Sequence, residues 1–158
     1  MNIIQEIALA HPLAELLVPT GWQVSKNNFI DASPVLLTGI TDEHARFLAA
    51  KNFFADDIFM ASSERTFDSG LPVTATLDVW CSPLGDEEIS PIEYQVSISI
   101  LKGKKRTALL SRTQSTEDRH HAQRIINAWM STFTWRVMYE FENSGLPIEH
   151  YFPDRPIP

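Results

Sequence analysis

The strongest constraint on the fold of this chain is an alternation of apolar and polar residues in two nearby stretches. Residues 72–81 and 92–101 both place apolar side chains at every second position. A period of two indicates strands with one buried and one wet face, which is typical of antiparallel sheets. Residues 107–113 supply a partner strand, because the short link before them contains Gly103 and suits a hairpin.

The remaining patterns predict further strands and three helices. Weaker strand signals fall at 22–31, 35–40 and 58–67. Apolar residues recur at helical spacing over 2–17, 42–52 and 116–143. In the last of these helices, Ser115 or Thr116 is the expected N-cap, and the poor helix formers around Phe133 predict a bend. Gly145 ends it, and the proline-rich residues 147–158 predict an extended tail.

Consecutive strands without intervening helices favour the α+β class. We expect one domain over 1–158, with a mostly antiparallel sheet of about five to six strands. A long C-terminal helix covers one face of that sheet, and an N-terminal helix and a short central helix complete the fold. No apolar run approaches the length of a membrane span, and the first residues lack a basic leader, so we expect a cytoplasmic protein.

The net charge of −7 is divided unevenly along the chain. Residues 1–100 hold four basic residues against fourteen acidic ones, residues 101–136 hold eight against two, and residues 137–158 hold one against four. The local charges are therefore −10, +6 and −3. An acidic molecule of this kind is a poor general binder of nucleic acid, so we expect a protein partner, and a basic one suits the acidic part.

The candidate partner surface combines acidic residues with a tryptophan on the polar side of a strand. It comprises Asp56, Asp57, Glu64, Asp68, Trp80, Asp86, Glu87 and Glu88. Complementary charge and an exposed aromatic anchor are features of protein interfaces. Trp135, which falls off the apolar stripe of the last helix, is a further candidate anchor. The alternative interpretation is a solvated acidic surface that keeps the protein soluble.

The basic segment centres on the predicted hairpin. Its candidate anion contacts are Lys102, Lys104, Lys105, Arg106 and Arg112. They could engage an anionic partner, although no aromatic residues are interleaved with them for base stacking. The alternative is a solvated turn whose lysines discourage pairing between sheet edges.

Catalytic chemistry finds little support in the sequence. Cys81, the single cysteine, ends the apolar alternation of its strand and has no neighbouring base, so a core role is expected. No nucleotide or serine-nucleophile motif occurs, and no cofactor or metal is expected. The residues that would serve a small metal-dependent hydrolase are Glu117, Asp118, His120 and His121.

These observations lead to an expected function without catalysis. The leading hypothesis is a protein-binding module, of the immunity or inhibitor type, that neutralises a partner through its acidic and aromatic surface. A secretion or assembly chaperone for one client protein is the first alternative, and it predicts an exposed apolar groove or a stable dimer. A small metal-dependent hydrolase that uses residues 117–121 is the second.

Overall fold

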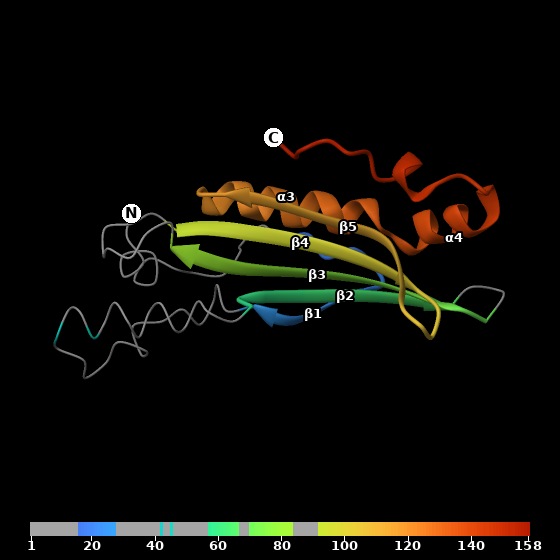
Figure 1. Ribbon diagram of the computed structural model, residues 1–158, viewed down its shortest axis with the longest axis horizontal. Helices are drawn as coiled ribbons and strands as arrows, with labels where there is room; N and C mark the ends of the chain where they lie inside the picture. Colours follow the sequence, from blue (N-terminus) through green and yellow to red (C-terminus); the bar gives the residue numbers. More distant parts are fainter. Residues whose placement is uncertain (1–15, 28–41, 43–44, 46–56, 67–69, 84–91) are drawn as a thin grey trace.

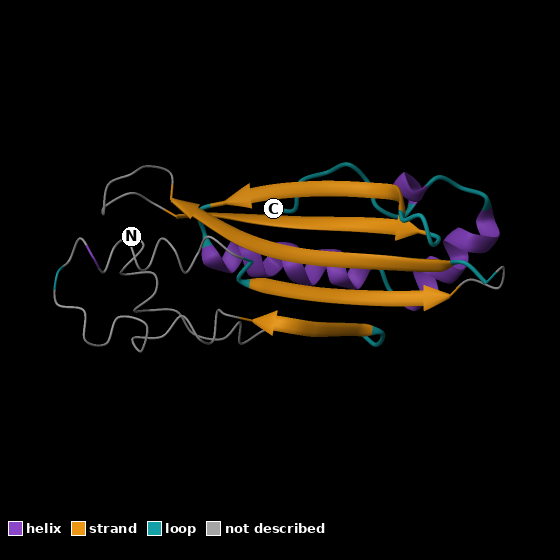
Figure 2. Ribbon diagram, turned by 60° about the horizontal axis from the view of Figure 1, so that its bottom comes forward, coloured by secondary structure: helices purple, strands orange, loops and turns teal. Residues whose placement is uncertain are grey.

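The computed structural model describes residues 16–27, 42, 45, 57–66, 70–83 and 92–158. Within them lies a five-stranded antiparallel sheet whose strands are ordered as they occur in the chain (Figures 1 and 2). The strands are β1 (Trp22–Asn27), β2 (Phe59–Thr66), β3 (Pro72–Pro83), β4 (Ile92–Lys102) and β5 (Thr107–Thr116). The prediction of an α+β chain with an antiparallel sheet is therefore confirmed.

The alternation in β3 and β4 separates the sheet into two faces. Leu77 lies opposite Ile98 and Val79 lies opposite Val96, so these four apolar residues share one face. All of them are fully buried beneath the helices. The buried residues of these two strands are Val73, Ala75, Leu77, Val79, Tyr94, Val96, Ile98 and Ile100. This helix-covered face forms the core.

The predicted long helix over 116–143 is wrong, because the structure has two helices there. These are α3 (Arg119–Thr132) and α4 (Trp135–Ser144). Between them, the Phe133 backbone leaves the helical conformation and its carbonyl accepts a hydrogen bond of 2.8 Å from the Trp22 indole Nε1. Thr134 then caps α4 by accepting a hydrogen bond from the Val137 amide. The expected bend is thus a break, fixed by an edge strand far away in sequence.

Both ends of this helical region are set by side-chain and glycine caps. Asp118 caps α3 through a 2.9 Å hydrogen bond from the His120 amide to its carboxylate. The prediction of Ser115 or Thr116 as the cap is wrong, because β5 continues as far as Thr116. At the other end, Gly145 adopts a left-handed conformation with φ of 70°, as the predicted stop requires.

The proline-rich tail folds back beside α3 (Figure 1). A short 3-10 helix, η2 (Ile148–His150), precedes Phe152, which is buried and stacks on Phe133 with ring centroids 4.9 Å apart. Further along, the Gln114 side chain exchanges two hydrogen bonds with the backbone of Ile157. The tail therefore joins α3 in covering the β5 side of the core.

Some predicted elements lie outside the described residues. They are the strand at 35–40, almost all of the helix at 42–52 and all but the end of the helix at 2–17. Of the last, Leu16 and Leu17 are described and have no helical structure. Of the central helix, Asp42 and Ala45 are described, and the Asp42 carboxylate accepts a hydrogen bond from the Ala45 amide.

Candidate functional site

The second face of the sheet is lined by small polar side chains. Figure 2 shows this face in front of α3, and no described helix or strand packs across it. We call it the open face. Its hydroxyl residues are Ser62, Thr74, Thr76, Ser97, Ser99, Ser111, Thr113 and Ser115. They form cross-strand rows, and one neighbouring pair, Thr113 and Ser97, is joined by a hydroxyl hydrogen bond of 3.4 Å. The result is a flat hydrogen-bonding surface.

Asp78 occupies the middle of the open face, on the central strand β3. Its neighbours in the cross-strand row are Met60 on β2 and Ser97 on β4. Partial burial raises the pKa of the Asp78 carboxyl above its ordinary value, and the negative charge of Asp57 raises that pKa further. A carboxylate in this position would be stabilised by a cation brought by a partner.

Trp80 lies on the same face as Asp78, two residues further along β3. Its cross-strand neighbour is Gln95, whose side-chain amide donates a 3.2 Å hydrogen bond to the Glu93 carboxylate. Glu64, an exposed residue of β2, lies on the open face opposite Thr74. The register therefore places Asp78 two residues before Trp80 on the same face of β3, and Glu93 diagonally across from Trp80 on β4.

The predicted partner residues divide into two groups. The structure places Glu64 and Trp80 on the open face, with Asp57 close enough to act on Asp78. The others lie outside the described residues, namely Asp56, Asp68, Asp86, Glu87 and Glu88. Asp78 and Glu93 are additions to the predicted contact surface. The signal for both was present, since each occupies a polar position in a strict alternation.

The structure places the predicted anion-contact residues in two separate places, the hairpin tip and the middle of β5. Lys102 pairs with Thr107 at the end of the hairpin, and the tip itself is tied to β3 by a 2.8 Å hydrogen bond from the Gly103 amide to the Pro72 carbonyl. Lys104, Lys105 and Arg106 are exposed there. A cavity of about 420 Å³ opens beside the tip, lined by Leu71, Lys102, Gly103, Lys104, Lys105 and Thr107.

Arg112 does not belong to this tip. It lies six residues beyond Arg106, about 20 Å along an extended strand, and opposite Ile98 on the helix-covered face. Its Nε lies 3.7 Å from Asp154 Oδ1 in the tail. Contact between the tip lysines and an anion stays a prediction, but Arg112 could not reach the same group.

The residues of the hydrolase alternative have structural partners. Asp118 is the N-cap of α3, and His120 is exposed. The His121 ring is engaged at both nitrogens: Nε2 lies 2.7 Å from the Ile157 carbonyl, and Nδ1 lies 2.9 Å from Thr116 Oγ1. In the described part of the chain, no three His, Cys, Asp or Glu side chains gather where they could hold a metal ion.

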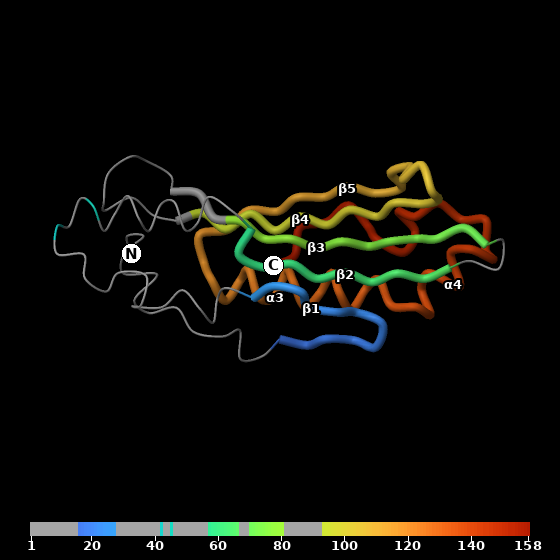
Figure 3. The backbone as a smooth tube through the Cα atoms, turned by 90° about the horizontal axis from the view of Figure 1, so that it is seen from below, coloured from blue at the N-terminus to red at the C-terminus, as the bar shows by residue number. Residues whose placement is uncertain are grey.

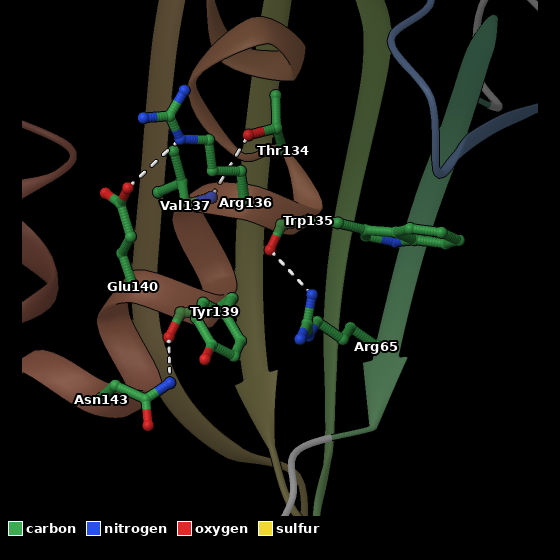
Figure 4. A network of polar contacts seen from close by, with 8 residues as sticks. All are labelled: Arg65, Thr134, Trp135, Arg136, Val137, Tyr139, Glu140 and Asn143. Carbon is green, nitrogen blue, oxygen red and sulfur yellow. Dashed lines mark hydrogen bonds and ion pairs between the residues drawn. The ribbon is translucent and has the colours of Figure 1, made fainter.

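A second exposed surface lies on α4, on the helix side of the sheet (Figure 4). Arg65 reaches from β2 to donate a 3.1 Å hydrogen bond to the Trp135 carbonyl, and its guanidinium lies 5.1 Å from the centroid of the Tyr139 ring. Trp135 is 43% exposed and Tyr139 is 48% exposed. The indole packs directly on Gly21, where a Cβ would lie 2.5 Å from Nε1. Trp135 is therefore an exposed aromatic residue held in one orientation.

Comparison of the chain with protein-family models, with curated proteins and with solved structures gives no match. Neither α3 nor α4 has the length and apolar character needed to cross a membrane.

Proposed function

We propose that this chain is a non-catalytic protein-binding module of the inhibitor or immunity type, and that it neutralises a basic partner through the open face. The observation that carries the proposal is the placement of Asp78 and Trp80 next to each other on the open face of the central strand β3. A partly buried carboxylate beside a tryptophan offers a binding place for an arginine or lysine of a partner.

The surrounding charge supports a basic partner. Asp57, Glu64, Asp78 and Glu93 lie on or beside the open face, where Lys26 is the cation that the register places among them. Like charges gathered on one face raise the association rate with an oppositely charged protein. The hydroxyl rows would supply hydrogen bonds around this centre, as the polar parts of interfaces do.

The open face also favours an inhibitor over a chaperone. A chaperone that holds an unfolded client needs an exposed apolar groove, and the described residues of this face are mainly serine, threonine, glutamine and acidic residues. Among the described residues, the exposed large apolar side chains lie outside the five strands, at Leu17, Val18, Leu71, Trp135, Tyr139 and Leu146.

The test begins with affinity capture from the native host, followed by binding measurements on the purified partner. Asp78→Asn and Trp80→Ala should each weaken the affinity at least about tenfold, because central anchors dominate interface energy. Glu149→Gln removes one negative charge at an exposed position of η2 and serves as the matched control, with affinity unchanged. A partner that binds both open-face variants as tightly as the native chain would contradict the proposal.

A further inference from the structure

The two edges of the sheet differ in how well they are protected against pairing with another strand. β1 and β5 form these edges, at opposite sides of the sheet in Figure 3. β1 has six residues, a bulge between Val24 and Lys26, and a lysine on the open face. Short length, bulges and lysines are the features by which proteins prevent edge-to-edge association. The β1 edge is therefore a poor template for a further strand.

β5 lacks most of these features. It has ten residues, without proline or lysine, and its exposed side chains toward the open face are alanine, serine and threonine. Its backbone pairs with β4, and no backbone hydrogen bond joins it to any other described segment. The two long polar side chains that point to the helix side, Arg112 and Gln114, are held by the tail. The outer edge of β5 is thus left free by the described residues.

The geometry of β5 selects a register for pairing with itself. Ile100 lies opposite Leu110 and Leu101 opposite Ala108, so Leu109 is an extra, bulged residue. Beyond the bulge, residues 110–116 pair regularly with β4, and Thr113 is the middle of that run. An antiparallel pair centred on Thr113 would use the whole regular run of both copies.

That register is also chemically compatible. It would place Thr113 opposite its own copy, Ser111 opposite Ser115, and Arg112 opposite Gln114. Threonine and serine pairs of this kind stabilise antiparallel strands, and no like charges would lie directly opposite each other. A cavity of about 180 Å³ opens beside this edge, lined in part by Thr113, Trp129, Phe152 and Pro153, and a paired strand would cover its mouth.

We propose that two copies of this chain associate through antiparallel pairing of their β5 edges, with Thr113 on the twofold axis. The occupant of the edge is a second copy, because one pairing satisfies both free edges at once. The protected β1 edges then stop further growth, so the product is a closed dimer with a continuous sheet. The dimer uses the sheet edge and leaves the open face of each copy accessible, so it is compatible with the proposed function. Because a stable dimer is also what the chaperone alternative predicts, the binding experiment on the open face is the one that distinguishes the two functions.

The experiment compares two lysine substitutions on the open face at opposite edges, Thr113→Lys on β5 and Gln23→Lys on β1. Both residues are exposed in the single chain, so both variants should retain the native circular dichroism. Sedimentation over a concentration series should give a dimer for the native chain and for Gln23→Lys. Thr113→Lys would bring two like charges together at the axis and should weaken dimerisation at least roughly tenfold.

A cysteine experiment tests the register. In a Cys81→Ala background, Thr113→Cys should oxidise to a disulfide-linked dimer, because its side chain would face its own copy. Ser111→Cys should remain unlinked, since it would face Ser115. If the native chain is monomeric throughout the sedimentation series, the proposal is wrong. The β5 edge would then be available to pair with an extended segment of another protein. The proposal would also be wrong if Thr113→Lys did not weaken the dimer. It would equally be wrong if the Ser111→Cys variant formed the disulfide-linked dimer and the Thr113→Cys variant did not.

Discussion

On the helix-covered face, Ile98 of β4 is fully buried, whereas its chain neighbours Ser97 and Ser99 on the open face stay partly exposed. The same strand therefore supplies core packing on one side and a polar surface on the other. In the described part of the chain, α3, α4 and the tail cover the helix side, and Leu16 also packs against the core there. The core packing and the proposed binding surface therefore lie on opposite faces of the sheet, so that substitutions can test them separately.

The largest expected effect comes from truncating the core on the helix side. Ile98→Ala should lower the free energy of unfolding by about 2–5 kcal/mol, because it leaves a cavity in a fully buried site. Ser99→Ala, the adjacent position on the open face, should change it by less than about 0.5 kcal/mol. Urea denaturation of the two variants measures the difference. Equal losses would show that the open face is buried in the folded chain.

The break between α3 and α4 provides the next test. Trp22→Phe keeps the aromatic packing but removes the indole donor, so the buried Phe133 carbonyl loses its 2.8 Å hydrogen bond. The expected loss of stability is about 1–3 kcal/mol. Thermal unfolding would record it, with Trp135→Phe as the control at an exposed tryptophan. A smaller loss for Trp22→Phe than for the control would show that the junction does not depend on this bond.

The tail should behave as part of the helix-side cover. Gln114→Ala removes both hydrogen bonds to the Ile157 backbone, and we expect it to lower stability by about 1 kcal/mol. Because the loss is local, limited proteolysis should cut the tail of this variant faster than that of the native chain. Thr113→Ala, its exposed neighbour on the open face, should leave the cleavage rate unchanged.

The smallest effect concerns Asp78 and depends on pH. Its pKa is raised in the folded chain, so the folded state holds the proton more tightly than the unfolded state does. Stability is therefore lost as pH rises from the ordinary carboxyl pKa through the raised folded value. Asp78→Asn should remove that loss and stabilise the chain above this range by less than about 1 kcal/mol, because the group is only partly buried. If Asp78→Asn shifted the denaturation midpoint from that of the native chain by the same amount at every pH, this prediction would be wrong.

The sequence predicted the sheet well where its side chains alternate. The bounds of β3 and β4 were predicted within two residues, because a period of two is a local property of a half-buried strand. The break at Phe133 was foreseen only as a bend. Its cause is a hydrogen bond from Trp22, which lies 111 residues away, and no local pattern contains such a contact.

The candidate site, too, was only partly predicted, because it depends on contacts between distant parts of the sequence. Trp80 was predicted as a surface residue because it lies on the polar side of its strand pattern, and Glu64 because it belongs to an acidic part of the chain. Asp78 was left out as an ordinary wet position, because its importance comes from Met60 and Ser97 on the neighbouring strands. Such neighbours depend on strand register, and register is fixed by the packed sheet as a whole.

The order of the strands has a consequence for how the chain folds. β2 to β5 each pair with the next strand in the chain, so their hairpins close short loops. By contrast, Leu17 bonds to Asn127 and Trp22 to Phe133 across 110 and 111 residues, and closing such long loops is slower. We expect pulsed hydrogen exchange to show amide protection in β3 and β4 before Trp22. The corner where β1 meets the helix break would then be the last part of the molecule to assemble.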